Sequence, residues 1–448
     1  MTFNPHTPED RKAMLEAIGV SSVAELFEVV PEEHRFPSLE LPPRLSEADA
    51  YRELVRLAER NVNASTAATF LGAGSYNHYV PATVQQILWR GEFYTAYTPY
   101  QPEVAQGTLQ AIYEFQSLIC LLTGMEVSNA SLYDGATALA EGALLSVSLP
   151  RQRTKIVVAG TVHPYYRSVL QTYTRGLLVT VEELPLPHET LFTTPEMVAP
   201  YLDERTACLV VQYPNFFGRI EDIAAFAEMA HQAGSRLLVS VYPIALGLLK
   251  APGELGADIV TGEGQSLGIP QSFGGPVLGL LATKRELVRQ LPGRLIGMTQ
   301  DSEGKRGFVM VLQTREQHIR REKATSNICT NQGLMSLAAT VYLSSLGKQG
   351  LRRVAELCYH KAHYLAERIA ALDGWEVVGA GPFFNEFAVR TPIAPEEVNR
   401  RLLDEGIIGG YPLNQIDPRL SDLMLVCATE QNTREQIDRF VSVLASLA

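Results

Sequence analysis

Short, continuously apolar runs are the clearest pattern in the middle of the chain, and they alternate with amphipathic stretches such as 223–233. Six of these runs have the length and composition of strands: 155–159, 177–181, 207–212, 236–241, 259–261 and 277–282. Strands that are apolar on both faces are typical of a parallel sheet covered by helices. The pattern therefore predicts an α/β domain built on a mainly parallel sheet with helices on both faces.

The two ends of the chain have other patterns. Thr7 followed by Pro8 and Asp10 predicts a capped helix that Gly19 ends, and Ser46 with Asp49 predicts the start of another. Beyond about residue 330, two long helical stretches precede a set of shorter strands and helices: 375–378, 387–390, 395–405, 423–427 and 433–447. We predict an N-terminal helical arm (1–68), a large α/β domain (69–325) and a small C-terminal α+β domain (326–448).

Composition narrows the classes of function. The chain has 448 residues, 46% of them hydrophobic, and a net charge of −11, which argues against a nucleic acid or an anionic membrane as the main partner. It has no apolar run of membrane-spanning length and no signal-peptide core near its start, so we expect a cytoplasmic protein. The five cysteines form no Cys-x-x-Cys pair, and His360 and His363 lack further ligands nearby, so no metal site is predicted.

Segment 262–270, closed by the glycines and proline of 274–276, resembles the loop on which pyridoxal-phosphate (PLP) enzymes carry their Schiff-base lysine. Gln265 stands at the expected lysine position, and an amide cannot form an imine. The acid that would face the pyridine nitrogen is also missing, because the expected strand end carries Tyr242. Two principal partners of the cofactor are absent together, which points to a vacated site.

Other residues could have formed the rest of such a site. The turn at Gly135-Ala136-Thr137 opens a helix whose free N–H groups could face an anion, although many structural helices begin in the same way. His163 follows a strand and could stack on a flat heterocycle, or it could be an ordinary structural histidine. We group these candidates as the vestigial pocket: Gly135, Ala136, Thr137, His163, Tyr242 and Gln265.

The densest polar and aromatic cluster lies earlier, in an inner segment (71–81) and a tyrosine loop (93–103). Glycines and prolines stiffen such loops, and tyrosine combines apolar area with a hydroxyl, a mixture favoured in interfaces and polar pockets. The alternative is a pair of well-packed connecting loops. The candidate residues for a site or interface are Ser75, Asn77, His78, Tyr94, Tyr97 and Tyr100.

Taken together, these motifs resemble the glycine decarboxylase P-protein family of the glycine cleavage system, in particular its N-terminal half, which some organisms make as a separate alpha subunit. The resemblance covers nearly the whole chain, and the motifs that carry it are 7–10, 72–78, 95–103, 133–137, 262–268 and 324–332. It implies a fold-type-I PLP scaffold. It also implies a homologous beta subunit that carries the lysine and the PLP, in an assembly expected to be α2β2.

The resemblance further implies an activity. With its partner, the chain would decarboxylate glycine and pass the aminomethyl group to the lipoyl arm of the H-protein. The six candidates of the inner segment and tyrosine loop would then reach toward the partner's site or support its wall. Two alternatives stay open: a scaffold or regulatory subunit without a catalytic part, and an independent PLP lyase or aminotransferase that uses another lysine.

Overall fold

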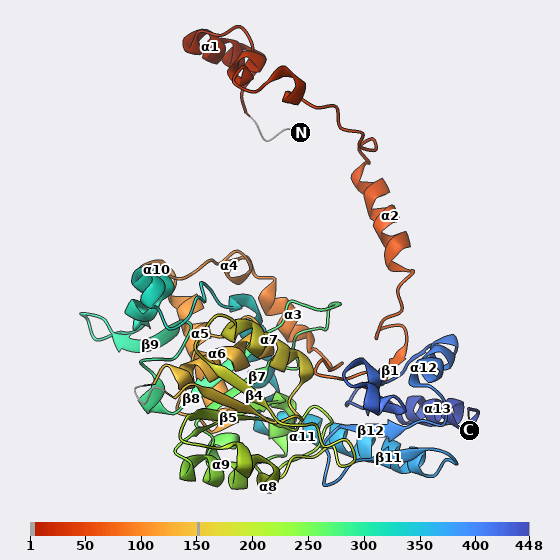
Figure 1. Ribbon diagram of the computed structural model, residues 1–448. Helices are drawn as coiled ribbons and strands as arrows, with labels where there is room; N and C mark the ends of the chain where they lie inside the picture. Colours follow the sequence, from red (N-terminus) through yellow and green to blue (C-terminus); the bar gives the residue numbers. More distant parts are fainter. Residues whose placement is uncertain (1–4, 150–152, 448) are drawn as a thin grey trace. The chain divides into compact units, whose positions relative to one another are not determined.

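A computed structural model describes residues 5–149 and 153–447 of the chain (Figure 1). Residue contacts divide the chain into two compact units, Met1–Val62 and Asn63–Ala448. The division into three domains at residues 68 and 325 stays a prediction.

The first unit contains two α-helices, α1 (Pro8–Ile18) and α2 (Glu47–Ala58), and two short 3₁₀ turns. Thr7 and Asp10 form the predicted capping box at the start of α1, and Gly19 ends the helix in the left-handed conformation. Ser46 caps α2 by accepting a hydrogen bond from the Asp49 amide. Both predicted helix starts are confirmed, although neither helix buries a side chain.

A seven-stranded sheet, in the order β2-β8-β7-β6-β5-β3-β4, forms the centre of the second unit. Its parallel part consists of β3 (Lys155–Val158), β4 (Thr180–Glu183), β5 (Thr206–Tyr213), β6 (Arg236–Val241) and β7 (Ile259–Glu263). Two antiparallel strands, β8 (Gly279–Thr283) and β2 (Val127–Ser128), extend it at one edge. The predicted mainly parallel sheet is confirmed. The predicted strand 177–181 starts too early, because Leu177 and Leu178 are exposed and the strand begins at Thr180.

Helices flank this sheet (Figure 1). The longer ones are α5 (Gln106–Thr123), α6 (Gly135–Val147), α7 (Pro164–Thr174) and α9 (Ile223–Gln232). Shorter helices of this unit are α3 (Ala82–Leu88), α4 (Gly91–Tyr94), α8 (Pro195–Val198) and α10 (Gln317–Arg320), of which α4 and α10 lie away from the sheet. The small side chains of α6 let it pack closely against β7 and α7. A hairpin of β9 (Leu295–Gln300) and β10 (Arg306–Val311) was not expected from the sequence pattern.

A second, four-stranded sheet lies toward the C-terminus, in the order β11-β12-β15-β14. Its strands and the helices beside them are β11 (Glu376–Val378), β12 (Glu386–Arg390), β14 (Tyr411–Pro412), β15 (Leu423–Cys427), α12 (Pro395–Asp404) and α13 (Arg434–Ala445). The long helix α11 (Gly333–Ala370) breaks at Gly347, where φ is 60°, so it corresponds to the two predicted helices. A short parallel pair joins β1 (Ala68–Thr69) to β13 (Ile407–Ile408).

The two largest of the apolar clusters among the described residues follow from this arrangement. The larger one fills the space between the seven-stranded sheet and its helices, and the smaller one lies between the second sheet, α13 and the end of α11. Within residues 5–149 and 153–447, no helix has the length and apolar content that crossing a bilayer requires.

Candidate functional site

The carboxyl ends of β3, β5, β6 and β7 meet at one edge of the large sheet, which is where ligands bind in open α/β folds. The structure brings His163, Tyr242 and Gln265 of the vestigial pocket together here, around a cavity of about 20 Å³. A space of that size holds about one water molecule. No lysine is among the described residues that line it.

Gln265 is buried and its side-chain amide is fully used. Its oxygen accepts a hydrogen bond from the Tyr76 amide at 3.0 Å, and its nitrogen donates to the carbonyls of Ile269 and Tyr76 at 2.7 and 3.2 Å. The residue is 2% exposed. Gln265 therefore ties the loop after β7 to the inner segment and presents no nucleophile to the cavity.

Glu263, at the end of β7, occupies the N-terminus of α6. Its carboxylate accepts hydrogen bonds from three backbone amides: Gly135 at 2.9 Å, Gln265 at 2.8 Å and Leu278 at 2.9 Å. Burial raises the pKa of Glu263 to about 7, and the three amides act in the opposite direction by favouring the charged form. Thr137 is engaged in the capping box with Asp134, and Ala136 is the second residue of the helix.

His163 stacks within its own chain. Its ring lies on Tyr166 with centroids 4.6 Å apart and planes at 12°, and its Nε2 is 3.1 Å from the Ala73 carbonyl oxygen. Gly74 makes this contact possible, because a Cβ there would come within 2.7 Å of the His163 ring. Burial lowers the pKa of His163 to about 4, so the ring is neutral at physiological pH.

Tyr242 follows β6 and is tied to the C-terminal region through His78. The Tyr242 ring packs on Tyr76 with centroids 4.2 Å apart, and its hydroxyl hydrogen-bonds the Nε2 of His78. The other ring nitrogen of His78 is 2.7 Å from the carboxylate of Glu430. Tyr76 donates to the buried Glu386 at 2.9 Å. Burial raises the pKa of Glu386 to about 7.

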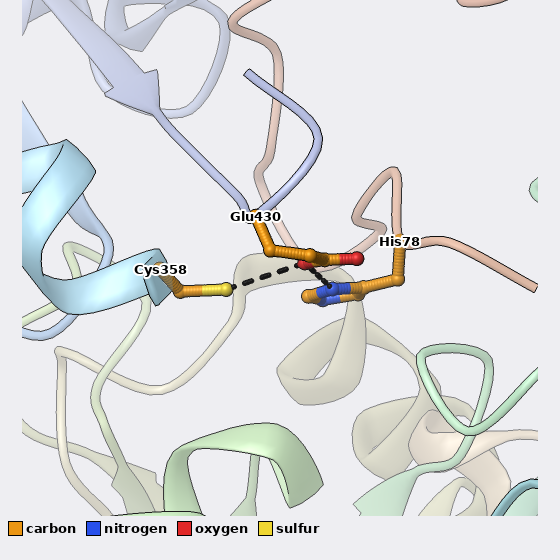
Figure 2. A group of neighbouring side chains, drawn as sticks. All are labelled: His78, Cys358 and Glu430. Carbon is orange, nitrogen blue, oxygen red and sulfur yellow. Dashed lines mark hydrogen bonds and ion pairs between the residues drawn. The ribbon is translucent and has the colours of Figure 1, made fainter. Parts of the chain in front are cut away.

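Figure 2 shows His78, Glu430 and Cys358, which come from the inner segment, the loop after β15 and α11. Their donor atoms lie within 4.8 Å of one another, and the thiol of Cys358 donates to Glu430 at 3.4 Å. Burial would raise the pKa of Glu430, but the hydrogen bond and charge of His78 outweigh it and lower the pKa to about 2. Sequence spacing could not reveal this cluster, because Glu430 lies 352 residues from His78.

The six candidates of the inner segment and the tyrosine loop fall into two groups. Residues of the first group form hydrogen bonds within the chain. His78 bonds to Tyr242 and Glu430, Ser75 accepts from Gln271 at 3.3 Å, and the Asn77 carbonyl accepts from the Thr429 hydroxyl at 2.7 Å. The second group faces outward, with Tyr94, Tyr97 and Tyr100 exposed by 63%, 89% and 46%.

The buried side chain of Arg294 contacts the tyrosine loop. Arg294 donates to the Tyr100 hydroxyl at 3.3 Å and to the Cys329 carbonyl at 2.6 Å. Tyr94 and Tyr97 line a cavity of about 240 Å³ between this loop, α5 and the start of α11. The sequence analysis missed Arg294, because an isolated arginine carries no pattern.

Over residues 1–444 the sequence matches the family described as glycine cleavage system P-protein. The chain belongs to this P-protein family. A relative from Thermomicrobium roseum is 74% identical over 444 residues, 99% of both chains, and one from Desulforamulus reducens is 51% identical over 449 residues, 100% of both. Both relatives are named "Probable glycine dehydrogenase (decarboxylating) subunit 1".

Solved structures give the same family. A crystal structure of glycine decarboxylase (P-protein) of the glycine cleavage system, in inhibitor-bound form, superposes with a TM-score of 0.91 and 45% identity over 100% of both chains. A Burkholderia pseudomallei sphingosine-1-phosphate lyase, 17% identical with a TM-score of 0.66 over 93% of this chain and 94% of its own, shows the fold alone. The predicted P-protein family and fold-type-I scaffold are confirmed.

The P-protein family and the fold imply PLP, but the pocket of this chain does not fit it. The Gly135 amide at the start of α6, where a phosphate could bind, is hydrogen-bonded to Glu263. The rings of Tyr76 and Tyr242 pack against each other at a tilt, and about 20 Å³ of space remains. No chemical step is therefore derived through a cofactor held by this chain.

Proposed function

We propose that this chain is subunit 1 (alpha) of a glycine dehydrogenase (decarboxylating), and that it acts with a homologous partner subunit that carries the PLP. The observation that supports this is the closed pocket of a chain that belongs to the P-protein family: Gln265 presents a hydrogen-bonded amide there, and Glu263 accepts from the first amide of α6. An enzyme of this class needs a cofactor, so the cofactor belongs on another chain.

In the proposed assembly, expected to be α2β2 and cytoplasmic, glycine is decarboxylated at the partner's site and the aminomethyl group passes to the lipoyl group of the H-protein. PLP, when bound there, supplies the electron sink for loss of carbon dioxide. The part played by this chain is to complete and shield that site, since excluding water protects a reactive intermediate.

The tyrosine loop is the surface we assign to that role. Tyr94, Tyr97 and Tyr100 expose aromatic rings and hydroxyls beside a cavity, a composition enriched in interfaces. Arg294 holds the loop in place through Tyr100 and the carbonyl of Cys329. Ser75, Asn77 and His78 would support the wall from within the chain.

Purification with and without a lysine-bearing homologue tests the proposal. The chain alone should show no absorption band of a protein-bound PLP imine and no glycine-dependent exchange of carbon dioxide. The co-purified pair should show both. An imine band together with exchange in the isolated chain would refute the proposal and support an independent PLP lyase or aminotransferase.

A scaffold or regulatory subunit is the second candidate, and the internal hydrogen bonds of Gln265, Tyr242 and His163 favour it. Tyr97→Phe and His78→Ala in the mixed assembly separate the two. A lower turnover supports a part in catalysis when size-exclusion chromatography shows the assembly intact and circular dichroism shows the variant folded, a check that His78→Ala needs because it removes a buried ion-pair partner. Unchanged turnover in both variants supports the scaffold.

A further inference from the structure

One carboxylate stands where an anionic ligand would otherwise bind in this chain. α6 is a thirteen-residue helix, and the N-terminus of such a helix attracts negative charge through its free N–H groups and dipole. Glu263 takes that position with three amide hydrogen bonds of 2.8–2.9 Å from Gly135, Gln265 and Leu278. These amides come from α6, from the loop after β7 and from the residue before β8, so they converge from three separate segments.

The fit between Glu263 and α6 is tight. A Cβ at Gly135 would lie 2.9 Å from the Cβ of Glu263 and 2.7 Å from the hydroxyl of Tyr166, so only glycine allows this approach. With about 20 Å³ left in the cavity, a phosphate group and the Glu263 carboxylate cannot both be present.

The hydroxyl of Ser266 is a second feature that points to a former ligand site. Ser266 lines the same cavity, is 2% exposed, and its hydroxyl has no hydrogen-bond partner among the described residues. A buried hydroxyl without a partner is costly in an ordinary core. It is suited to a group that would enter the cavity from outside.

We propose that Glu263 is a built-in anion that closes a phosphate-binding position in this chain, so that phosphate monoesters, PLP among them, are excluded by charge and by volume. This inference rests on the same closed pocket as the proposed function, but phosphate binding by the chain alone tests it separately from turnover of the assembly. Removing the carboxylate should free the amides of Gly135, Gln265 and Leu278 for an external phosphate.

Binding of inorganic phosphate to the full chain tests this, measured by calorimetry at about pH 8, where Glu263 is ionised. Glu263→Ala should bind phosphate at least about tenfold more tightly than the wild type, and it should bind pyridoxal phosphate more tightly than pyridoxal. The matched control is Glu141→Ala, which removes a different buried carboxylate. Glu141 lies on α6, accepts a hydrogen bond from Ser326, and has a pKa that burial raises to about 7, like that of Glu263. Glu141→Ala should show no gain.

A correctly folded Glu263→Ala variant that binds phosphate no better than Glu141→Ala would overturn the proposal. If Glu263→Ala does not fold, Glu263→Ser replaces it, because a hydroxyl can still accept from one of the three amides. A further measurement needs no variant. In the wild type, the amide signal of Gly135 should not shift when phosphate is added, and a saturable shift would equally overturn the proposal.

Discussion

The vestigial pocket and the tyrosine loop are both rich in aromatic and polar side chains, yet they differ in what those side chains contact. At the pocket, Gln265, Tyr242 and the neighbouring Glu263 all bond to groups of their own chain. In the loop, Tyr94 and Tyr97 are mostly exposed. Similar residue types therefore serve two different roles. Changes in the pocket should lower the stability of this chain, and changes in the loop should lower the turnover of the proposed assembly.

The largest effect is expected from Tyr76→Ala. This change removes a buried ring that packs on Tyr242 and takes away one of the two donors to Glu386, so we expect a loss of about 3–5 kcal/mol in the free energy of unfolding. Chemical denaturation followed by circular dichroism measures it. Tyr76→Phe, which keeps the ring, should lose only about 1–3 kcal/mol. Equal losses in the two variants would contradict the packing argument.

The next effect is expected from His78→Ala, because it leaves the carboxylate of Glu430 buried without its main partner. We expect a loss of about 3 kcal/mol in stability at neutral pH. The exposed His360 is the control, and His360→Ala should change stability by less than about 0.5 kcal/mol.

The His78–Glu430 pair also predicts how the free energy of unfolding depends on pH. The folded-state pKa of Glu430, about 2, lies below its ordinary value of 4.5, so its contribution to stability is present above pH 4.5 and is lost as the pH falls toward 2. Stability measured across that window should fall less steeply in His78→Ala than in the wild type. Parallel curves of stability against pH for the two proteins would show that His78 does not lower the pKa of Glu430.

A moderate effect on activity alone is expected from Tyr97→Ala. The side chain is 89% exposed, so stability should change by less than about 0.5 kcal/mol. Turnover of the mixed assembly should fall by about tenfold, the loss of roughly 1.4 kcal/mol of interaction with the partner or substrate. Leu178→Ala, at another exposed position, is the control and should leave turnover unchanged. A loss of stability in Tyr97→Ala would contradict the conclusion that the tyrosine loop, unlike the pocket, contributes little to the stability of the chain.

The smallest effect on activity is expected from Gln265→Lys, which should not create an active subunit. Tyr242 supplies no acid at the end of β6, and Glu263 still occupies the amides at the start of α6. Reduction with borohydride in the presence of PLP, followed by mass spectrometry and an assay of glycine turnover, checks this. An imine trapped at residue 265 together with turnover would contradict it.

Local pattern predicted the parallel strands and the helix that starts at Gly135, because burial on both faces and the residues that cap a helix are visible in a few neighbouring residues. It also placed His163, Tyr242 and Gln265 at one sheet edge, since parallel strands end together. It could not supply Glu430, which lies 352 residues from His78, or predict that the neighbours of Glu263 would direct three amides at it. Such partners depend on tertiary packing.

The internal bonding of Glu263 has a consequence for how the cell maintains this chain. A protein that needs a bound ligand to be stable loses folded material when the ligand is scarce. Here the backbone amides are already satisfied by a side chain of the same polypeptide. Its folded concentration should therefore not follow vitamin B6 nutrition, and in the proposed assembly starvation for that vitamin would limit only the partner subunit.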